Sequence, residues 1–181
     1  MRLILHPDHN LKPLDISINI DYIHIEGHRY EFSFHPTQPI GLAARDSLRF
    51  EPCMPLYGHE LSPTITPLQA RLSFAVSFDK YFIGRDALLK QKLEKPEMVL
   101  VGFELTGRGV AREHYPVLYD GEQVGFVSSG MYSPTTSRYL GMAFVPRNIS
   151  KIGTEIEIQI RKKAVPAKII KRPFYIPAYR R

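Results

Sequence analysis

Alternating apolar and polar residues dominate the chain from residue 98 onward. Six short segments there have the pattern of strands: 98–105, 117–119, 124–127, 138–145, 154–161 and 164–171. Asp120-Gly121 separates the second segment from the third, and this dipeptide supplies the positive φ angles of a tight hairpin turn. Six short strands so closely spaced favour a small antiparallel barrel or sandwich.

The first 97 residues mix helical and strand patterns. Asp15 to Phe34 predicts a hairpin that turns near residues 26–28. Helices are predicted at 41–51 and 84–93, with a further strand at 71–78. A Pro-containing linker at 94–97 marks the boundary. We therefore expect an α+β fold, with a mixed α/β portion at 1–97 and an antiparallel β-barrel domain at 98–181.

Composition places the chain among globular proteins. Of its 181 residues, 44% are hydrophobic and 23% are charged. No apolar run reaches the roughly 18 residues that a membrane-spanning helix needs, and residues 1–7 are too short for a secretory signal. The single cysteine, Cys53, permits no intrachain disulfide. We expect a soluble cytoplasmic protein.

The net charge of +6 is unevenly distributed. Residues 161–181 contain eight of the 24 basic residues and none of the 18 acidic ones. This end either meets an anionic partner or forms a solvated strand pair with cationic outer faces. Helix-turn-helix, zinc-finger and RNP-type signals are missing from the sequence, which argues against nucleic acid.

The usual catalytic constellations are weak. Five of the seven histidines precede residue 36, and a proline separates His6 from His9, so turn or surface roles are favoured over a metal site. Ser128-Ser129-Gly130 lacks the glycine spacing of a nucleophile elbow. Cys53 has no base nearby in sequence and is interpreted as a packed thiol.

Arg45 and Arg49 share one face of the predicted helix at 41–51. Arginine is rarely buried without a partner, and its planar fork suits a carboxylate. One interpretation is that these side chains bind a ligand. The other is an internal ion pair with Asp46 or Glu51.

Several motifs, in order, resemble the aminomethyltransferase of the glycine cleavage system, the T-protein. The resemblance begins with residues 41–51, Met54-Pro55-Leu56-Tyr57-Gly58-His59-Glu60 and 66–70. It continues through residues 79–88 and through 124–135, which are similar to the family's Gly-x-Val-Thr-Ser-Gly-x-x-Ser-Pro hairpin. Arg172-Pro173-Phe174-Tyr175 resembles its terminal motif. In all, the resemblance covers about residues 39–181.

The resemblance implies folate-dependent one-carbon transfer. The family takes the aminomethyl group on the lipoyl arm of the H-protein, transfers its methylene to tetrahydrofolate and releases ammonia. Arg45 matches the family's folate-contacting arginine, and Tyr179 matches a C-terminal ligand-contacting position. Met54 and Tyr57 match the neighbourhood of the pocket wall. The implied partners are a reduced folate and the lipoylated H-protein.

Residues 1–38 depart from the family pattern. The family's folate-binding Gly-Tyr-Thr-Gly-Glu segment is absent from the sequence, and the most similar segment, Gly27-His28-Arg29-Tyr30-Glu31, is a poor match to it. The family's catalytic aspartate belongs to an upstream half that this sequence does not contain. We therefore expect a truncated, split or rebuilt T-protein, incomplete as a lone chain. The alternative is a non-catalytic module that binds folate or a glycine-cleavage partner.

Overall fold

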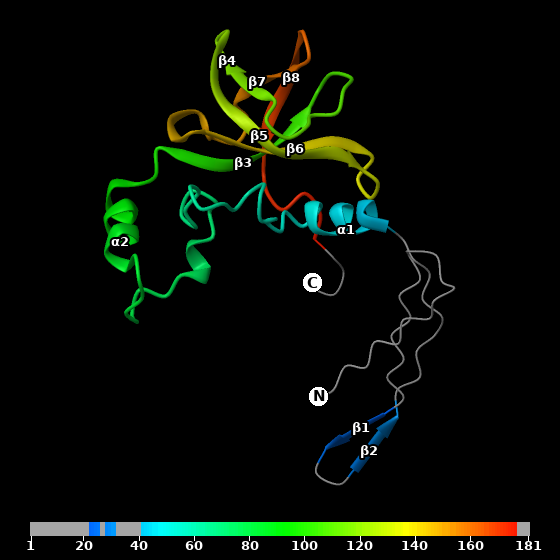
Figure 1. The fold of residues 1–181 in the computed structure, drawn as a ribbon. Helices are drawn as coiled ribbons and strands as arrows, with labels where there is room; N and C mark the ends of the chain where they lie inside the picture. The colour runs from blue at the N-terminus through cyan, green and yellow to red at the C-terminus, as the bar shows by residue number, and fades with distance from the viewer. Residues whose placement is uncertain (1–21, 26–27, 32–40, 177–181) are drawn as a thin grey trace. The chain divides into compact units, whose positions relative to one another are not determined.

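The computed structural model describes residues 22–25, 28–31 and 41–176. The chain divides into two compact units, Met1–Ala44 and Arg45–Arg181. In the first unit, β1 (Tyr22–Ile25) and β2 (His28–Glu31) form an antiparallel hairpin in which Ile25 lies opposite His28 (Figure 1). This hairpin lies where the sequence predicted one. The strand expected at 16–20 falls outside the described residues.

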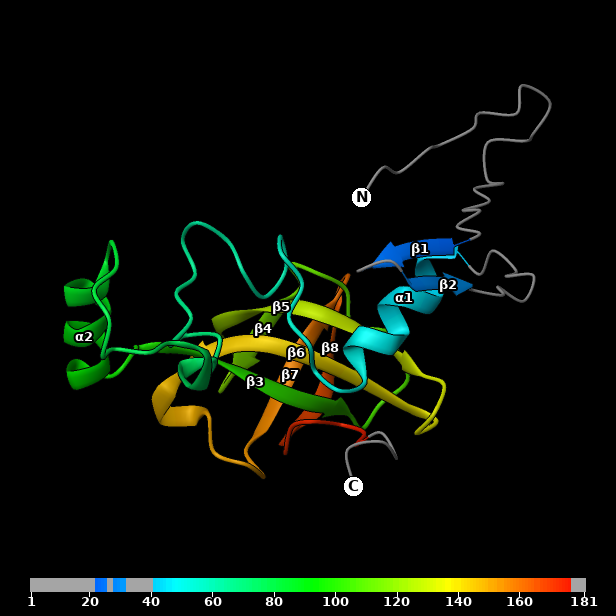
Figure 2. The ribbon, with the colours of Figure 1, turned by 90° about the horizontal axis from the view of Figure 1, so that it is seen from below.

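The second unit contains a closed barrel of six antiparallel strands, seen from two directions in Figures 1 and 2. The order around the barrel is β3-β6-β5-β4-β7-β8. The strands are β3 (Met98–Leu105), β4 (Pro116–Tyr119), β5 (Glu122–Ser133), β6 (Arg138–Pro146), β7 (Glu155–Ile160) and β8 (Lys163–Ile170). All six strands were predicted from the sequence, and the expected α+β fold with a C-terminal antiparallel barrel is confirmed.

Strand β3 is buried on both faces. Val101 and Phe103 point into the barrel core, while Leu100 belongs to a second apolar cluster outside it. Phe50, the last residue of helix α1 (Gly41–Phe50), joins that outer cluster with no exposed surface. A strand covered on both sides reads as a continuous apolar run, which explains the sequence of 98–105.

Segment 71–78 is not a strand, so that prediction is wrong. It contains the 3₁₀ helix η1 (Ser73–Ala75), and Phe74 is 85% exposed. An alternating pattern becomes a strand only where a sheet edge accepts its hydrogen bonds, and the closed barrel leaves no such edge.

Helix α2 (Arg85–Glu94) follows, within a residue of its predicted bounds. It contacts the loop before it, where the Thr66 hydroxyl donates to the Gln91 side chain over 2.7 Å. The helices in the described ranges are all too short or too polar to cross a membrane. The barrel begins at Met98, whereas the division of the chain into two compact units falls between Ala44 and Arg45. The domain boundary expected at 94–97 therefore stays a prediction.

Candidate functional site

Glu60 joins the segment after α1 to strand β5. Its side chain has no exposed surface. Oε1 accepts hydrogen bonds from the hydroxyls of Ser128 (2.7 Å) and Ser129 (2.6 Å). Oε2 accepts from the backbone N–H of Leu56 (3.0 Å) and from Nη1 of Arg49 (2.8 Å). Four donors, one of them a guanidinium, thus compensate the burial of the carboxylate.

Arg49 completes this network from α1. Its Nε donates to Asp46 over 2.7 Å, and its Nη2 donates to the Ser129 hydroxyl over 3.0 Å. Of the two interpretations offered by the sequence, the internal ion pair is confirmed for Arg49. Its guanidinium is fully engaged inside the protein and positions α1 on the barrel.

Glu51 forms a second buried link, to the turn between β5 and β6. Its carboxylate accepts from the Ser133 hydroxyl (2.6 Å) and from the Thr135 backbone N–H (2.9 Å) and hydroxyl (2.6 Å). Burial raises the pKa of Glu51, but the bonds from Ser133 and Thr135 outweigh it and hold the pKa below the ordinary 4.5. The ionised form therefore keeps this turn against α1.

Cys53 packs against the outer apolar cluster, and burial raises the pKa of its thiol to about 11. A thiol with so high a pKa is almost wholly protonated at neutral pH. The structure thus agrees with a packed thiol.

The residues matched to folate contacts lie beside this network but face outward. Arg45 is exposed on α1, and it forms no ion pair with any described residue. Met54 is 40% exposed and Tyr57 is 72% exposed in the segment that follows. Tyr179 lies outside the described residues. The structure brings Arg45, Met54 and Tyr57 onto one continuous segment and leaves their side chains accessible.

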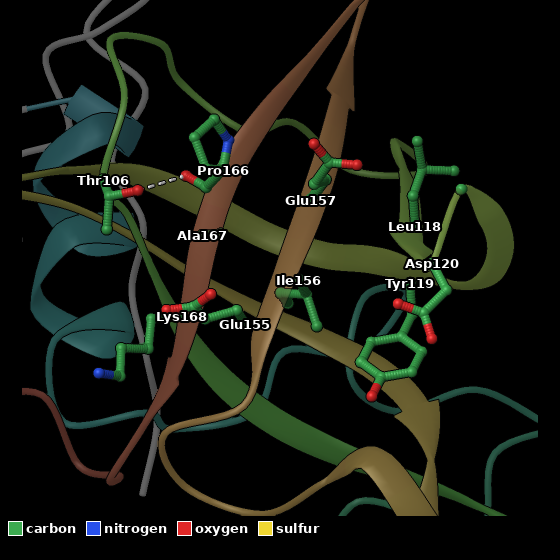
Figure 3. A pocket seen from close by; sticks show the side chains of 11 residues that line it. Thr106, Leu118, Tyr119, Asp120, Glu155, Ile156, Glu157, Pro166, Ala167 and Lys168 are labelled. Carbon is green, nitrogen blue, oxygen red and sulfur yellow. Dashed lines mark hydrogen bonds between the residues drawn. The ribbon is translucent and has the colours of Figure 1, made fainter.

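Three hollows on the second unit are lined by other residues. The largest, about 700 Å³, lies between the 108–115 loop and the β7–β8 turn. Its rim is cationic: Arg108, Arg112, Arg161, Lys162 and Lys163. Another, about 430 Å³, lies over β7 and β8, where Figure 3 shows the Thr106 hydroxyl donating to the Pro166 carbonyl. There Glu155 pairs in register with Lys168, so its lining has mixed charge.

The comparisons with known proteins match both parts of this architecture. The family description "Glycine cleavage T-protein C-terminal barrel domain" covers residues 99–175, and "GCVT N-terminal domain" covers residues 33–80. The chain matches two parts of the glycine cleavage T-protein family. The match confirms the resemblance seen in the motifs, and the buried network joins the two matched regions through Glu51 and Glu60.

Curated relatives of this chain are named aminomethyltransferase. That of Natranaerobius thermophilus is 54% identical over 140 residues, which are 76% of this chain and 38% of the relative. That of Geobacillus kaustophilus is 50% identical over 139 residues, again 76% of this chain and 38% of the relative. The chain therefore spans about two fifths of the length of these relatives.

A solved structure shows the same partial overlap. The crystal structure of glycine cleavage system aminomethyltransferase T from Bartonella henselae is 32% identical and superposes with a TM-score of 0.72. The superposition covers 75% of this chain and 39% of that one.

Glu60 and Ser128-Ser129 lie in motifs that the sequence shows, but the sequence did not predict that these residues are in contact. Glu60 and Ser128 are 68 positions apart, and no local pattern reports such a contact. The signal in the sequence was chemical. Glu60 and Arg49 each lie next to apolar residues, and a charged side chain that is buried there needs a partner of opposite charge.

Proposed function

We propose that this chain is the barrel-bearing part of an aminomethyltransferase. The complete enzyme transfers a methylene from the aminomethyl-lipoyl H-protein to tetrahydrofolate and releases ammonia. The observation that carries the proposal is the 54% identity over 140 residues to a curated aminomethyltransferase. Because the curated relatives described above are named aminomethyltransferase, the alternative of a non-catalytic module is not favoured. The lone cysteine suits a reducing compartment such as the cytoplasm.

The folate contacts are proposed for the outward-facing segment beside the buried network. The exposed Arg45 guanidinium offers a planar fork to a carboxylate of the folate. Met54 and Tyr57 offer an apolar wall to the pterin. Tyr179 is the fourth proposed contact. The three hollows described above are lined by other residues, and we propose that the folate pocket takes further walls from another part of the T-protein.

We propose that the further walls of the folate pocket come from the upstream half of the T-protein, in the same chain or in a separate one. Four large apolar side chains between residues 73 and 94 are 83–96% exposed: Phe74, Tyr81, Ile83 and Leu93. Contiguous exposed apolar side chains mark an interaction surface, and these four lie within one stretch of the chain. The match to the N-terminal domain description ends at residue 80, close to these side chains in sequence. This position supports the proposal that the rest of that domain covers them.

The upstream half also supplies the acid that the resemblance assigns to catalysis. We propose that this chain contributes binding and positioning: Arg45 holds the folate, and the network of Arg49, Glu60 and Ser129 fixes the helix that carries Arg45. The lipoylated H-protein is the proposed partner that delivers the aminomethyl group. Turnover then requires both halves, because positioning and proton transfer each change rates by orders of magnitude.

The test of the folate site is a titration with tetrahydrofolate in the presence of the upstream half of a related aminomethyltransferase. Arg45→Lys keeps the charge but loses the planar fork, and should weaken binding by about 1–3 kcal/mol. Arg45→Ala should weaken it at least as much. Lys162→Ala, which removes an exposed cation from the β7–β8 turn, should bind like the parent. Binding unchanged in both Arg45 variants would refute the assigned site.

A further inference from the structure

A small hollow opens where strands β3 and β8 separate. Their pairing ends at Gly102 opposite Ile170, after which the chain turns away at Lys171 and Arg172. The segment before η1 closes the gap, since the Leu100 N–H donates to the Gln69 carbonyl over 2.8 Å. The volume of the hollow is about 200 Å³. Its lining side chains include Arg71, Ser150, Lys171 and Arg172.

The charge around this hollow is one-sided. Three cationic residues line it, and no acidic residue does. Arg71 donates from Nη2 to the Ser150 hydroxyl over 3.2 Å. Within the described ranges, Arg172 has neither a hydrogen bond nor an ion pair from its guanidinium, although the side chain is half-buried. Partial burial of a guanidinium without a counter-ion costs free energy, which a bound anion would offset.

The electrostatics support the same conclusion. Burial lowers the pKa of Arg71, and the neighbouring Arg147 lowers it further. Burial also lowers the pKa of Arg172, and Arg71 adds to this effect. Cys53 and Glu60 act in the opposite direction on the pKa of Arg172, but Glu60 is already paired with Arg49. The cations therefore repel one another, and no acidic residue lines the hollow that they share.

The arginines are held in place by the fold. A Cβ on Gly102 would lie 2.7 Å from Cγ of Arg172 and 2.7 Å from the ring of Phe174. Glycine at this position lets the stem of Arg172 lie directly on β3. On the other side, Arg71 adopts a left-handed backbone with φ of 59° at the end of its turn. Both side chains are thus positioned by close packing and by the backbone, as expected of a built site.

We propose that this hollow binds a phosphate group, either as inorganic phosphate or as a small phosphate monoester. Two arginine forks suit the oxygens of a phosphate, and three lining cations exceed what one carboxylate neutralises. A phosphate held by Arg71 and Arg172 would bridge the segment before η1 and the end of β8, and so raise the stability of the unit. This site is separate from the folate contacts proposed at Arg45, and it does not depend on them.

The test is calorimetric titration of the full chain with inorganic phosphate and, separately, with glycerol phosphate, at fixed ionic strength balanced with chloride. We expect saturable binding and a phosphate-dependent rise in Tm. Acetate should show neither. Binding of both phosphates indicates a site open to monoesters, whereas binding of inorganic phosphate alone indicates the free ion.

Variants locate the site. Arg172→Gln and Arg71→Gln should each weaken phosphate binding at least tenfold, and Lys171→Gln, at an exposed position, should weaken it a few-fold while preserving the fold. Lys162→Gln removes a cation from the other basic hollow and should change nothing. Absence of phosphate binding, equal binding of acetate, or binding unaffected by all three substitutions at the site would each overturn the proposal.

Discussion

Two buried glutamates, Glu51 and Glu60, connect α1 and the loop after it to strand β5 and the turn that follows. Glu60 accepts hydrogen bonds from Ser128 and Ser129 on β5 and from the Leu56 N–H of its own loop. Glu51 accepts three, from Ser133 and Thr135. Glu60 also neutralises Arg49, whose side chain is 10% exposed. Removing either charge would leave its partners buried without compensation.

Glu60→Gln should therefore destabilise the protein strongly. The amide cannot neutralise Arg49, and its NH₂ group would face donors, so we expect a loss of about 3–5 kcal/mol in the free energy of unfolding. Chemical denaturation measures this loss. The matched control is Glu94→Gln, which breaks an exposed pair with Lys90 at 3.9 Å and should change stability by about 0.5 kcal/mol or less. Equal stability of the two variants would contradict the role given to Glu60.

Thr135→Val tests the charge state of Glu51 through pH. The hydrogen bonds of Ser133 and Thr135 depress the folded pKa of Glu51 below 4.5, so the ionised carboxylate stabilises the fold above that value. This contribution is lost as the pH falls through the folded pKa. The variant lacks the 2.6 Å bond from the Thr135 hydroxyl, so it should be less stable than the parent at neutral pH. The gap in unfolding free energy should narrow below pH 4.5, and a gap independent of pH would rule out this linkage.

At the scale of elements, β3, β5 and β6 carry the packing that fixes α1. Phe103 on β3 lies against β6 at Gly141, where an added Cβ would come within 2.1 Å of the ring. Phe50 packs against the outer faces of β3 and β6 in the second apolar cluster. Glycine at position 141 therefore leaves room for the Phe103 ring in the barrel core, while Phe50 covers the outer faces of the same two strands.

Gly141→Ala should push the buried Phe103 ring out of its place and destabilise the barrel by about 1–3 kcal/mol or more, as overpacking does in well-packed cores. Gly121→Ala is the comparison. It lies in open space at the β4–β5 turn with φ of 82°, so only backbone strain opposes it, at about 1 kcal/mol. Thermal and denaturant unfolding should rank Gly141→Ala as the more damaging change. The reverse order would show that the strands can relax around Phe103.

The sequence predicted the elements better than their contacts. Periodicity located every barrel strand and both α-helices of the described residues because each repeat is local. Of the ion pairs that the sequence left open, the structure contains the one between Arg49 and Asp46. The pattern at 71–78 misled because strand formation depends on a free sheet edge elsewhere in the fold. The links from Glu51 and Glu60 to β5 span 68 to 84 positions, and only folding brings those residues together.

At the scale of the whole molecule, the exposed apolar residues at 73–94 define the surface proposed to meet the upstream half. Ile83 is 96% exposed and Leu93 is 83% exposed, so neither contributes much to the stability of this unit. Their burial in a complex would release apolar surface from water, which drives association.

Ile83→Glu and Leu93→Glu should leave the unfolding free energy within about 0.5 kcal/mol of the parent, as expected for surface substitutions. Each should weaken association with the upstream half at least tenfold, because a buried unpaired carboxylate opposes the contact. Gln123→Glu, on the exposed end of β5, is the control and should associate normally. Association measured by sedimentation or calorimetry that is unaffected by both substitutions would place the contact elsewhere.

The central claim is tested most directly by reconstitution. The chain is mixed with the upstream half of an aminomethyltransferase, the part of such a relative that this chain does not match, and ammonia release is measured with aminomethyl-lipoyl H-protein and tetrahydrofolate. We predict folate-dependent ammonia release from the mixture, little from either half alone, and a marked decrease with Arg45→Ala. Ammonia release no faster in the mixture than with the upstream half alone, while the two halves associate, would contradict the proposal that this chain is the barrel-bearing part of an aminomethyltransferase.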